Sequence, residues 1–358
     1  MLPHLRDLAI PAALRELGAA GAAAPLARRI VNAVHQRGVT DWEDLGLGQA
    51  KLRPLQQRFR FGPLLSEGET SRAEDRTRKY LFRTVTDGRS VEVVLVRNRN
   101  ALTLCLSSQA GCALGCTFCA TAQMGLERHL TAGEITEAKV RAERAAGVRV
   151  SDVVFMGQGE PLHNYDAVMD ACINLNHDLG PCISRKRITI STVGLTPQIR
   201  RYARERRRWR LHLSLHSAIQ ATRAALMPIA QRHPLPELLD AMREYQRRCA
   251  VPWVTLQYVA IPGVNMDRRH VDALRERLAG LRHILNVIPY NDTGAFRPPT
   301  WAEVKEFTTR LRALGCPVKV RYSAGKRAGM GCGQLSAERV PVAPSFGHAL
   351  APPGIFTG

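Results

Sequence analysis

The stretch ALTLCLSSQAGCALGCTFC, residues 101–119, decides the fold. It opens with an apolar, β-rich run over 101–106, which predicts a buried strand, and a helical pattern follows over 131–146. Between them lies a short loop with the cysteine spacing CxxxCxxC. Its cysteines are Cys112, Cys116 and Cys119. The stretch therefore predicts a strand, a thiol-bearing loop and a helix, which together form one βα unit with chemistry in its loop.

The same alternation continues along the chain, with helical patterns between most of the apolar runs. Strands that alternate with helices indicate a parallel α/β sheet. Six such units and a last strand suit an open barrel related to the eight-stranded one; a doubly wound sheet is the alternative, and periodicity does not choose between them. The expected strands cover 101–106, 150–156, 187–192, 210–215, 254–261, 284–288 and 317–322. The expected helices cover 131–146, 165–178, 196–207, 235–249, 267–280 and 300–314.

Two segments precede this core and one follows it. Helical patterns at 25–35 and 42–59 indicate a small helical region, and the polar stretch 66–71 is interpreted as a linker. Asp87-Gly88 then separates two alternating runs, which predicts a β-hairpin. The predicted domains are a helical domain over 1–68, a β-hairpin extension over 69–100, the barrel over 101–338 and a Pro- and Ala-rich tail over 339–358.

The composition points to a polyanionic partner. The 358 residues include 51 Lys and Arg against 31 Asp and Glu, a formal net charge of +20. With 45% hydrophobic residues the chain can bury a core, which excludes intrinsic disorder. The charge favours a nucleic acid, with a merely arginine-rich surface as the alternative. Aromatic residues make up only 6%, so we expect the shape of an RNA and the pocket, rather than a stacking platform, to provide specificity.

The cysteines indicate a reducing compartment. No stretch approaches the roughly 18 apolar residues of a membrane span, and the first residues lack a secretory signal pattern. We therefore expect a cytoplasmic protein whose nine cysteines are not a disulfide framework. Four of the nine fall within the fifteen residues from Cys105 to Cys119, a clustering that calls for a function.

Three thiolates on one short loop can converge on a metal or an iron–sulfur cluster. Structural zinc usually takes four ligands in two pairs, and this loop offers one triplet without a nearby His or Cys pair. A [4Fe–4S] cluster with three thiolate ligands leaves one iron open for a substrate or cofactor; zinc and spare thiols are the alternatives. The spacing, with the aromatic Phe118 before the last cysteine, resembles the signature of the radical S-adenosylmethionine (SAM) superfamily.

Further polar residues gather where the predicted strands end, and parallel strands bring those ends to one edge. After the second strand, Gly157 and Gly159 allow a ligand close to the backbone, and Glu160 suits a ligand ammonium group; a plain tight turn is the alternative. In the fourth run the alternating pattern places polar side chains on one inward face, which favours ligand binding over a buried core histidine. These are His212, Ser214 and His216.

The remaining strand ends add three more candidates. Ser191 ends the third strand and Asn291 follows the sixth. Cys332 follows the last strand and lies between Gly331 and Gly333. Structural cysteines usually have apolar neighbours, so we expect Cys332 to be exposed and reactive.

The chain resembles the RlmN/Cfr family of radical SAM RNA adenosine methyltransferases over residues 25–336. The most specific segments are Thr103 to Cys116, Gly159 to Leu162, Ser214 to His216 and Cys332 to Leu335. The resemblance implies a partial (β/α)6 barrel with an RNA-binding N-terminal helical domain. It also implies two cofactors, a [4Fe–4S] cluster and SAM, with two SAM molecules used per turnover.

The resemblance assigns a role to each matched position. It implies that Cys112, Cys116 and Cys119 ligate the cluster. It implies that SAM is contacted by Gly159, Glu160, Ser191, Ser214, Leu215, His216 and Asn291. It implies that Cys332 carries the methyl group, that Cys105 is its disulfide-forming partner, and that Glu92 accepts the proton. Cys172, Cys182, Cys249 and Cys316 have no assigned role.

The chemistry implied by the resemblance explains why a thiol is needed. Carbons 2 and 8 of adenine are electrophilic, so ordinary SAM methylation does not reach them. In the family a methylated cysteine, here Cys332, loses a hydrogen to a SAM-derived radical and adds to the ring, and Cys105 then releases the product. The expected substrate is adenine carbon 2 in 23S ribosomal RNA, with transfer RNA as a further candidate. A flavodoxin or ferredoxin would supply electrons, and a monomer without membrane attachment is expected.

The residues alone leave three alternative functions open. They are methylation of carbon 8, a radical SAM reaction on another substrate, and an RNA-binding protein with a structural cluster. The chain also departs from the family pattern: Gly325 to Gly331 is basic where an acidic stretch is usual, and Gln158 replaces the commoner Met. The arginine-rich segments 185–187 and 200–210 suit RNA, or are solvated faces.

Overall fold

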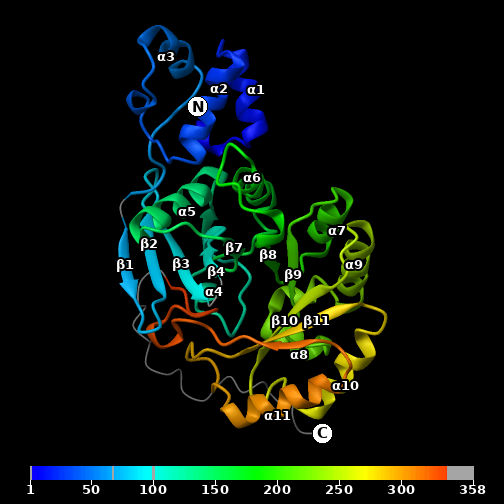
Figure 1. Cartoon of the computed structure of the whole chain (residues 1–358). Coiled ribbons are helices and arrows are strands. Elements are labelled where there is room, and N and C mark those ends of the chain that lie inside the picture. The colour runs from blue at the N-terminus through cyan, green and yellow to red at the C-terminus, as the bar shows by residue number, and fades with distance from the viewer. Residues whose placement is uncertain (1, 67, 99–100, 337–358) are drawn as a thin grey trace.

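The computed structural model describes residues 2–66, 68–98 and 101–336. The predicted tail over 339–358 and the last two residues of the predicted barrel lie outside the described residues. Figure 1 shows the helices of the N-terminal region at one end of the molecule and α10 and α11 at the other, with the sheet between them.

In the described part of the chain a ten-stranded sheet runs in the order β1-β2-β3-β4-β7-β8-β9-β10-β11-β12. From β4 onward every pair is parallel and the strands follow in chain order, without the reversal that marks a doubly wound fold. The open barrel is therefore confirmed. The parallel strands are β4 (Ala101–Leu106), β7 (Asp152–Phe155), β8 (Ile188–Thr192), β9 (Arg210–Ser214), β10 (Val254–Ala260), β11 (His283–Pro289) and β12 (Val318–Val320).

Helices connect these strands, six of them at the predicted places, whereas the short helix over Gln220–Leu226 was not predicted. The first begins with a capping box between Thr131 and Glu134 and ends at Gly147, whose φ of 66° is the left-handed conformation that glycine tolerates. Figure 1 shows the connecting helices around the outside of the curved sheet. They are α5 (Ala132–Ala146), α6 (Tyr165–Asn176), α7 (Thr196–Arg204), α8 (Gln220–Leu226), α9 (Leu235–Arg248), α10 (Arg268–Arg277) and α11 (Trp301–Arg312).

The main core lies between the sheet and these helices. Leu211, Leu213 and Leu215 are buried in it together with Ile199 of α7 and Leu238 of α9. Each such side chain contributes about 1.5–3 kcal/mol when it is fully buried. Because neighbouring residues of a strand face opposite sides, this outward packing turns Ser214 toward the interior of the barrel.

The N-terminal helices α1 (Ile10–Ala19), α2 (Ala24–His35) and α3 (Gln49–Gln56) have an apolar core of their own. The pattern at 42–59 predicted a longer helix. It is divided into a 3-10 turn over Glu43–Leu45 and α3, because Gly46 takes the left-handed conformation with φ of 61°. Within the described residues, no helix combines the length and apolar character that crossing a membrane requires.

An antiparallel extension joins the barrel through β4. It consists of β1 (Glu69–Arg72), β2 (Arg78–Arg83) and β3 (Ser90–Asn98), and the predicted hairpin corresponds to β2 and β3. Interpreting 66–71 as a linker was wrong for its second half, which belongs to β1. Every residue of β1 is exposed, so its composition is that of a loop, and backbone pairing with β2 makes it a strand.

The structure shows where the arginine-rich segments lie relative to the strands. Residues 185–187 directly precede β8, and residues 200–210 connect the end of α7 to the start of β9. Both therefore lie at the amino ends of the strands, opposite the edge where chemistry is expected. Arg201 and Arg207 are also paired with carboxylates, including Glu205 at 2.8 and 2.7 Å. The local charge run gave no information about the edge on which it lies.

A buried ion pair attaches the N-terminal helical region to α5. The Nε of Arg6 lies 3.5 Å from Oε2 of Glu137, and both side chains are almost fully buried. Glu137 also accepts hydrogen bonds from the backbone N–H groups of Leu64 and Leu65. Its carboxylate therefore neutralises Arg6 and fixes the chain where it leaves the helical region.

We expect Glu137→Gln to lower the free energy of unfolding by about 3–5 kcal/mol, because it leaves the Arg6 charge buried without its partner. The measurement is urea denaturation followed by circular dichroism. Asp178→Asn is the matched control, since it breaks an exposed pair with Arg28 and should cost less than about 1 kcal/mol. Equal losses in the two variants would contradict the assignment of the buried pair.

Candidate active site

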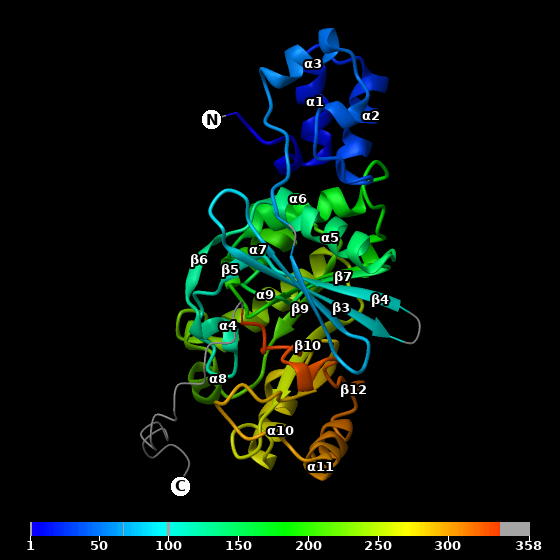
Figure 2. The ribbon, with the colours of Figure 1, turned by 90° about the vertical axis from the view of Figure 1, so that its left-hand side faces the viewer.

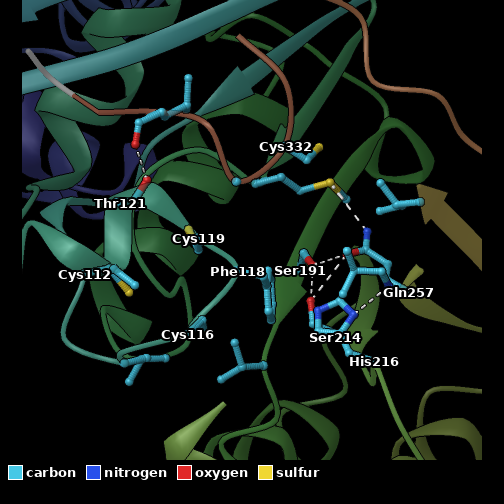
Figure 3. Close-up of a pocket in the computed structure, with 18 of the residues that line it drawn as sticks. Cys112, Cys116, Phe118, Cys119, Thr121, Ser191, Ser214, His216, Gln257 and Cys332 are labelled. Atoms are coloured by element: carbon cyan, nitrogen blue, oxygen red, sulfur yellow. Dashed lines mark hydrogen bonds between the residues drawn. The ribbon is translucent and has the colours of Figure 1, made fainter. Parts of the chain in front are cut away.

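A cavity opens at the carboxyl ends of the parallel strands, and we call it the first cavity. The three loop cysteines line one part of it, and residues from β8, β9, β10 and the segment after β11 line another. Figure 3 shows Cys112, Cys116 and Cys119 on one side, Ser191, Ser214 and His216 on the other, and Phe118 between them. The sequence-predicted residues that line it are Cys112, Cys116, Cys119, Gly159, Glu160, Ser191, Ser214, His216, Asn291 and Cys332.

The cysteine loop is held by backbone hydrogen bonds. The N–H of Cys112 donates to the carbonyl of Gly125 at 2.7 Å, and that of Thr117 donates to Leu226 of α8 at 3.0 Å. The N–H of Cys119 turns back to the carbonyl of Cys116 at 3.1 Å, just before α4 (Ala120–Gln123). The loop therefore presents its thiols from a fixed backbone.

The three thiols repel one another in their charged forms. Burial raises the pKa of Cys112 to about 11 and raises that of Cys116 well above its usual value, and the neighbouring thiols raise both further. In the described part of the chain, no three His, Cys, Asp or Glu side chains gather closely enough to hold a single metal ion. Three thiols on one short loop suit a cluster in which each thiolate binds a different iron.

Glu160 lies at the turn after β7. Gly159 has φ of 94°, and a Cβ there would collide with the side chain of Gln109, so only glycine fits. The N–H of Glu160 donates to Oε1 of Gln109 at 2.8 Å, and its carboxylate accepts from the N–H groups of Leu162 and Val193. Burial raises the pKa of Glu160 to about 7, although the hydrogen bonds that the carboxylate accepts lower it.

A polar strip crosses the neighbouring strands. The hydroxyl of Ser191 donates to Oε1 of Gln257 at 3.0 Å, and the hydroxyl of Ser214 lies 3.4 Å from both Ser191 and Gln257. Gln257 and Ser214 are register partners on β10 and β9, which is why their side chains meet. The strip offers hydroxyl and amide groups to a ligand in the first cavity.

His216 lines the cavity in a neutral form. Burial lowers the pKa of His216 to about 3, and its Nδ1 accepts from the backbone N–H of Val259 at 3.0 Å. Its ring lies edge-on to Phe118 at 4.9 Å between centroids. His212 and Leu215 do not line the cavity. His212 lies nearer the amino end of β9 than Ser214 does, and Leu215 packs its side chain into the main core.

Cys332 lies on the segment that follows β12, and Asn291 holds that segment in place. The side-chain amide of Asn291 donates to Oγ of Ser323 at 2.8 Å and to the carbonyl of Cys332 at 2.9 Å. The N–H of Ala120 donates to the carbonyl of Gly333 at 2.8 Å, which ties the same segment to the cysteine loop. Cys332 is half-buried, not exposed as its glycine neighbours predicted.

A second cavity adjoins the first, and Cys332 lines both. Cys105 of β4 lines the second cavity, and burial raises the pKa of Cys105 to about 12, with the Cys332 thiol raising it further. Arg321 opposes that shift, and its Nη2 lies 3.7 Å from Sγ of Cys332. Met156 also lines both cavities. The structure therefore brings together the two thiols expected to react, and both are free.

Glu92 lies apart from the two thiols expected to react. It is fully buried on β3, and its Oε1 lies 2.9 Å from Nζ of Lys79 on β2. Burial raises the pKa of Glu92, and Lys79 lowers it. Glu92 lines neither cavity, but it shares a face of β3 with Val94, two residues on, which does line the second cavity.

The basic stretch before Cys332 is attached to the turn between β1 and β2. Oδ2 of Asp75 accepts from the N–H of Gly325 at 2.7 Å, and Gly325 has φ of 68°. Arg327 and Glu74 form a looser exposed pair at 3.9 Å. The antiparallel extension therefore contacts the segment that carries the reactive thiol. Figure 2 shows this segment crossing the face of the barrel near β3 and β10.

Sequence reasoning missed three residues of the site. Gln257 interrupts the apolar run in the middle of β10, and Arg321 directly follows β12, so a polar residue inside an apolar strand and a position at a strand end were usable signals. Gln109 lies between β4 and the cysteine loop and contacts Glu160 only through the fold, so no local pattern marked it.

Comparisons with known proteins agree with this architecture. Residues 106–275 match the Radical SAM superfamily. The chain is 41% identical over 314 residues to the dual-specificity RNA methyltransferase RlmN 1 of Myxococcus xanthus, covering 85% of this chain and 86% of that protein. It is 38% identical to RlmN of Syntrophobacter fumaroxidans, covering 87% and 92%. A crystal structure of a radical SAM methyltransferase from Sphaerobacter thermophilus superposes with a TM-score of 0.86 at 37% identity, covering 94% of this chain and all of that one.

We expect Asn291→Ala to make Cys332 react roughly tenfold faster with iodoacetamide in the metal-free protein, since the lost hydrogen bonds correspond to about 1.4 kcal/mol. Peptide mass spectrometry of timed samples measures the rate. Asn176→Ala is the control, because it loses a similar amide-to-carbonyl bond, to Ile183 at 2.8 Å, on α6. An unchanged rate at Cys332 would show that Asn291 does not restrain the segment.

Proposed function

The chain belongs to the RlmN family of radical SAM RNA methyltransferases, and on that premise we propose that it methylates carbon 2 of an adenine in 23S ribosomal RNA through a methylated Cys332. One observation carries the proposal. Cys332 lines both the cavity with the three loop thiols and the adjoining cavity with Cys105. A thiol at such a boundary is placed to receive a methyl group in one cavity and to pass it to RNA in the other.

The enzyme uses a [4Fe–4S] cluster and SAM. We propose Cys112, Cys116 and Cys119 as the cluster ligands, because three mutually repelling thiols line one wall and a cationic cluster would relieve that repulsion. When bound, the cluster and SAM supply the methyl group and the radical chemistry that adenine carbons require.

The opposite wall is proposed to hold SAM. Glu160 suits the ammonium of its methionine part, because a cation there would favour the carboxylate that burial disfavours. Neutral His216 and the hydroxyls of the polar strip suit its uncharged polar atoms. The proposed set is Gly159, Glu160, Ser191, Ser214, Leu215, His216 and Asn291; Leu215 would act through its backbone, since its side chain is in the core.

The two reactive thiols have complementary tasks in this proposal. Cys332 accepts the methyl group, and Arg321 beside its sulfur stabilises negative charge there. Cys105 forms a sulfur–sulfur bond with Cys332 and so frees the methylated RNA. Burial keeps Cys105 protonated at neutral pH, which protects it until RNA is in place.

Glu92 is proposed to accept the ring proton. Its support is its position on the same face of β3 as Val94 and its ion pair with Lys79, which favours the charged carboxylate. Lys79 would thus keep the base ready inside an apolar environment that otherwise favours its protonated form.

The wider setting of the reaction is also a proposal. The N-terminal helical domain is proposed to bind RNA, transfer RNA to be a further substrate, and a flavodoxin or ferredoxin to donate electrons to a monomeric enzyme. The net charge of +20 supports the polyanionic partner.

The proposed function predicts 2-methyladenosine in ribosomal RNA treated with the anaerobically reconstituted protein, SAM and a reductant. Liquid chromatography with mass spectrometry of nucleosides identifies the product. Cys116→Ala should bind much less iron and give no product, whereas Cys182→Ala, which removes an exposed thiol, should match the wild type. Exclusive formation of 8-methyladenosine would refute carbon 2 as the methylated position. Absence of any methylated adenosine would refute the proposed methylation itself.

We expect Cys105→Ala to accumulate RNA covalently attached to Cys332, because the thiol that releases the product is missing. Denaturing gel electrophoresis of labelled RNA after one turnover detects the adduct. Cys249→Ala, which alters a half-buried thiol outside both cavities, should release free product. If the Cys105→Ala variant yields only free RNA, the proposal that Cys105 releases the product from Cys332 is refuted.

A further inference from the structure

A groove beside the reaction site is lined by exposed aromatic side chains. Trp301 and Tyr322 line it and are 67% and 52% exposed, among the largest values for big apolar side chains in the described residues. Single exposed apolar residues are normal, but large rings that line one groove together can mark a binding site. The fold core does not use these rings, so their positions point to a ligand.

The groove is continuous with both reaction cavities. Tyr290 and Asn291 line the groove and the first cavity, while Tyr322 and Ser323 line the groove and the second cavity. Ser323 accepts the hydrogen bond from Asn291, which also holds the carbonyl of Cys332. A strand whose adenine reaches Cys332 would therefore have a neighbouring nucleotide at this groove.

The groove is also positively charged, and the capped start of α11 forms part of it. Trp301 starts α11 directly after Pro298, Pro299 and Thr300, where Thr300 and Glu303 form a capping box that fixes the helix start. Nζ of Lys305 lies 5.2 Å from the Trp301 ring centroid, and Lys326 lines the groove. Within the part of the chain that the structure describes, neither lysine forms an ion pair, so both charges remain available to a phosphate.

We propose that this groove binds one nucleotide of single-stranded RNA next to the reactive adenosine, its base stacked on Trp301 or Tyr322 and its phosphate near Lys326. Stacking on aromatic rings with basic side chains alongside is how proteins hold single-stranded RNA. The proposal rests on the proposed function for the placement of the adenosine. It gives aromatic residues a part in recognition that their low abundance did not predict.

The test is equilibrium binding of two fluorescent probes, a short oligoadenylate and an abasic strand of equal length. Trp301→Ala and Tyr322→Ala should weaken oligoadenylate binding about 5- to 100-fold, since stacking contributes about 1–3 kcal/mol per base, and leave abasic-strand binding unchanged. Trp301→Phe should restore most of the affinity. Lys326→Ala should weaken both probes similarly and reduce the salt dependence by about one charge.

Trp253→Ala is the matched control. Trp253 is 42% exposed with Arg282 5.5 Å from its ring centroid, but it directly precedes β10 and so lies at the opposite edge of the barrel. If the Trp301 and Tyr322 variants bind oligoadenylate like this control, or lose abasic-strand binding equally, the groove is not a stacking site. Binding is measured without turnover. A negative binding result would therefore refute the stacking groove alone, and a negative methylation assay would refute the proposed function. SAM cleavage without RNA should be the same in the Trp301→Ala and Trp253→Ala variants as in the wild type.

Discussion

The site depends on one constraint: parallel strands in chain order bring all their carboxyl ends to one edge of the sheet. The cysteine loop after β4, Glu160 after β7, Ser191 on β8 and Asn291 after β11 come from separate parts of the chain, yet they line one cavity. The apolar residues that alternate with them, such as Leu213, are fully buried against the outer helices. Packing on the outside of the barrel thus decides which side chains face the chemistry on the inside.

The thiol that joins the two cavities is not part of the barrel. Cys332 is held by hydrogen bonds to Asn291 and by the link between Gly333 and Ala120. The segment thus touches the cysteine loop, the rim of the barrel and, through Gly325 and Asp75, the antiparallel extension. A segment held by a small number of hydrogen bonds can exchange them readily. This suits a residue that lines two neighbouring cavities.

The sequence predicted the elements well and the contacts between them less well. Each parallel strand and its helix appeared at the expected place, because hydrophobic periodicity is local. The strand β1 was missed because its residues are all exposed, and the edge on which residues 200–210 lie was not visible in their charge. The cysteine triplet and Glu160 were found through motif spacing. Gln257 contacts Ser191, 66 positions away, and Arg321 approaches Cys332 across a loop, so no local pattern marks either contact. Glu92 pairs with Lys79 and lines neither cavity, which its matched position did not reveal.

The bond between Asp75 and Gly325 joins residues 250 positions apart. It couples the turn between β1 and β2 to the approach to Cys332. A chimera could take the segment after β12 from a relative and keep this chain's turn between β1 and β2. The two parts of the contact would then come from different proteins. A change of sequence next to Gly325, such as one in Lys326 or Arg327, therefore has to remain compatible with a turn much earlier in the chain.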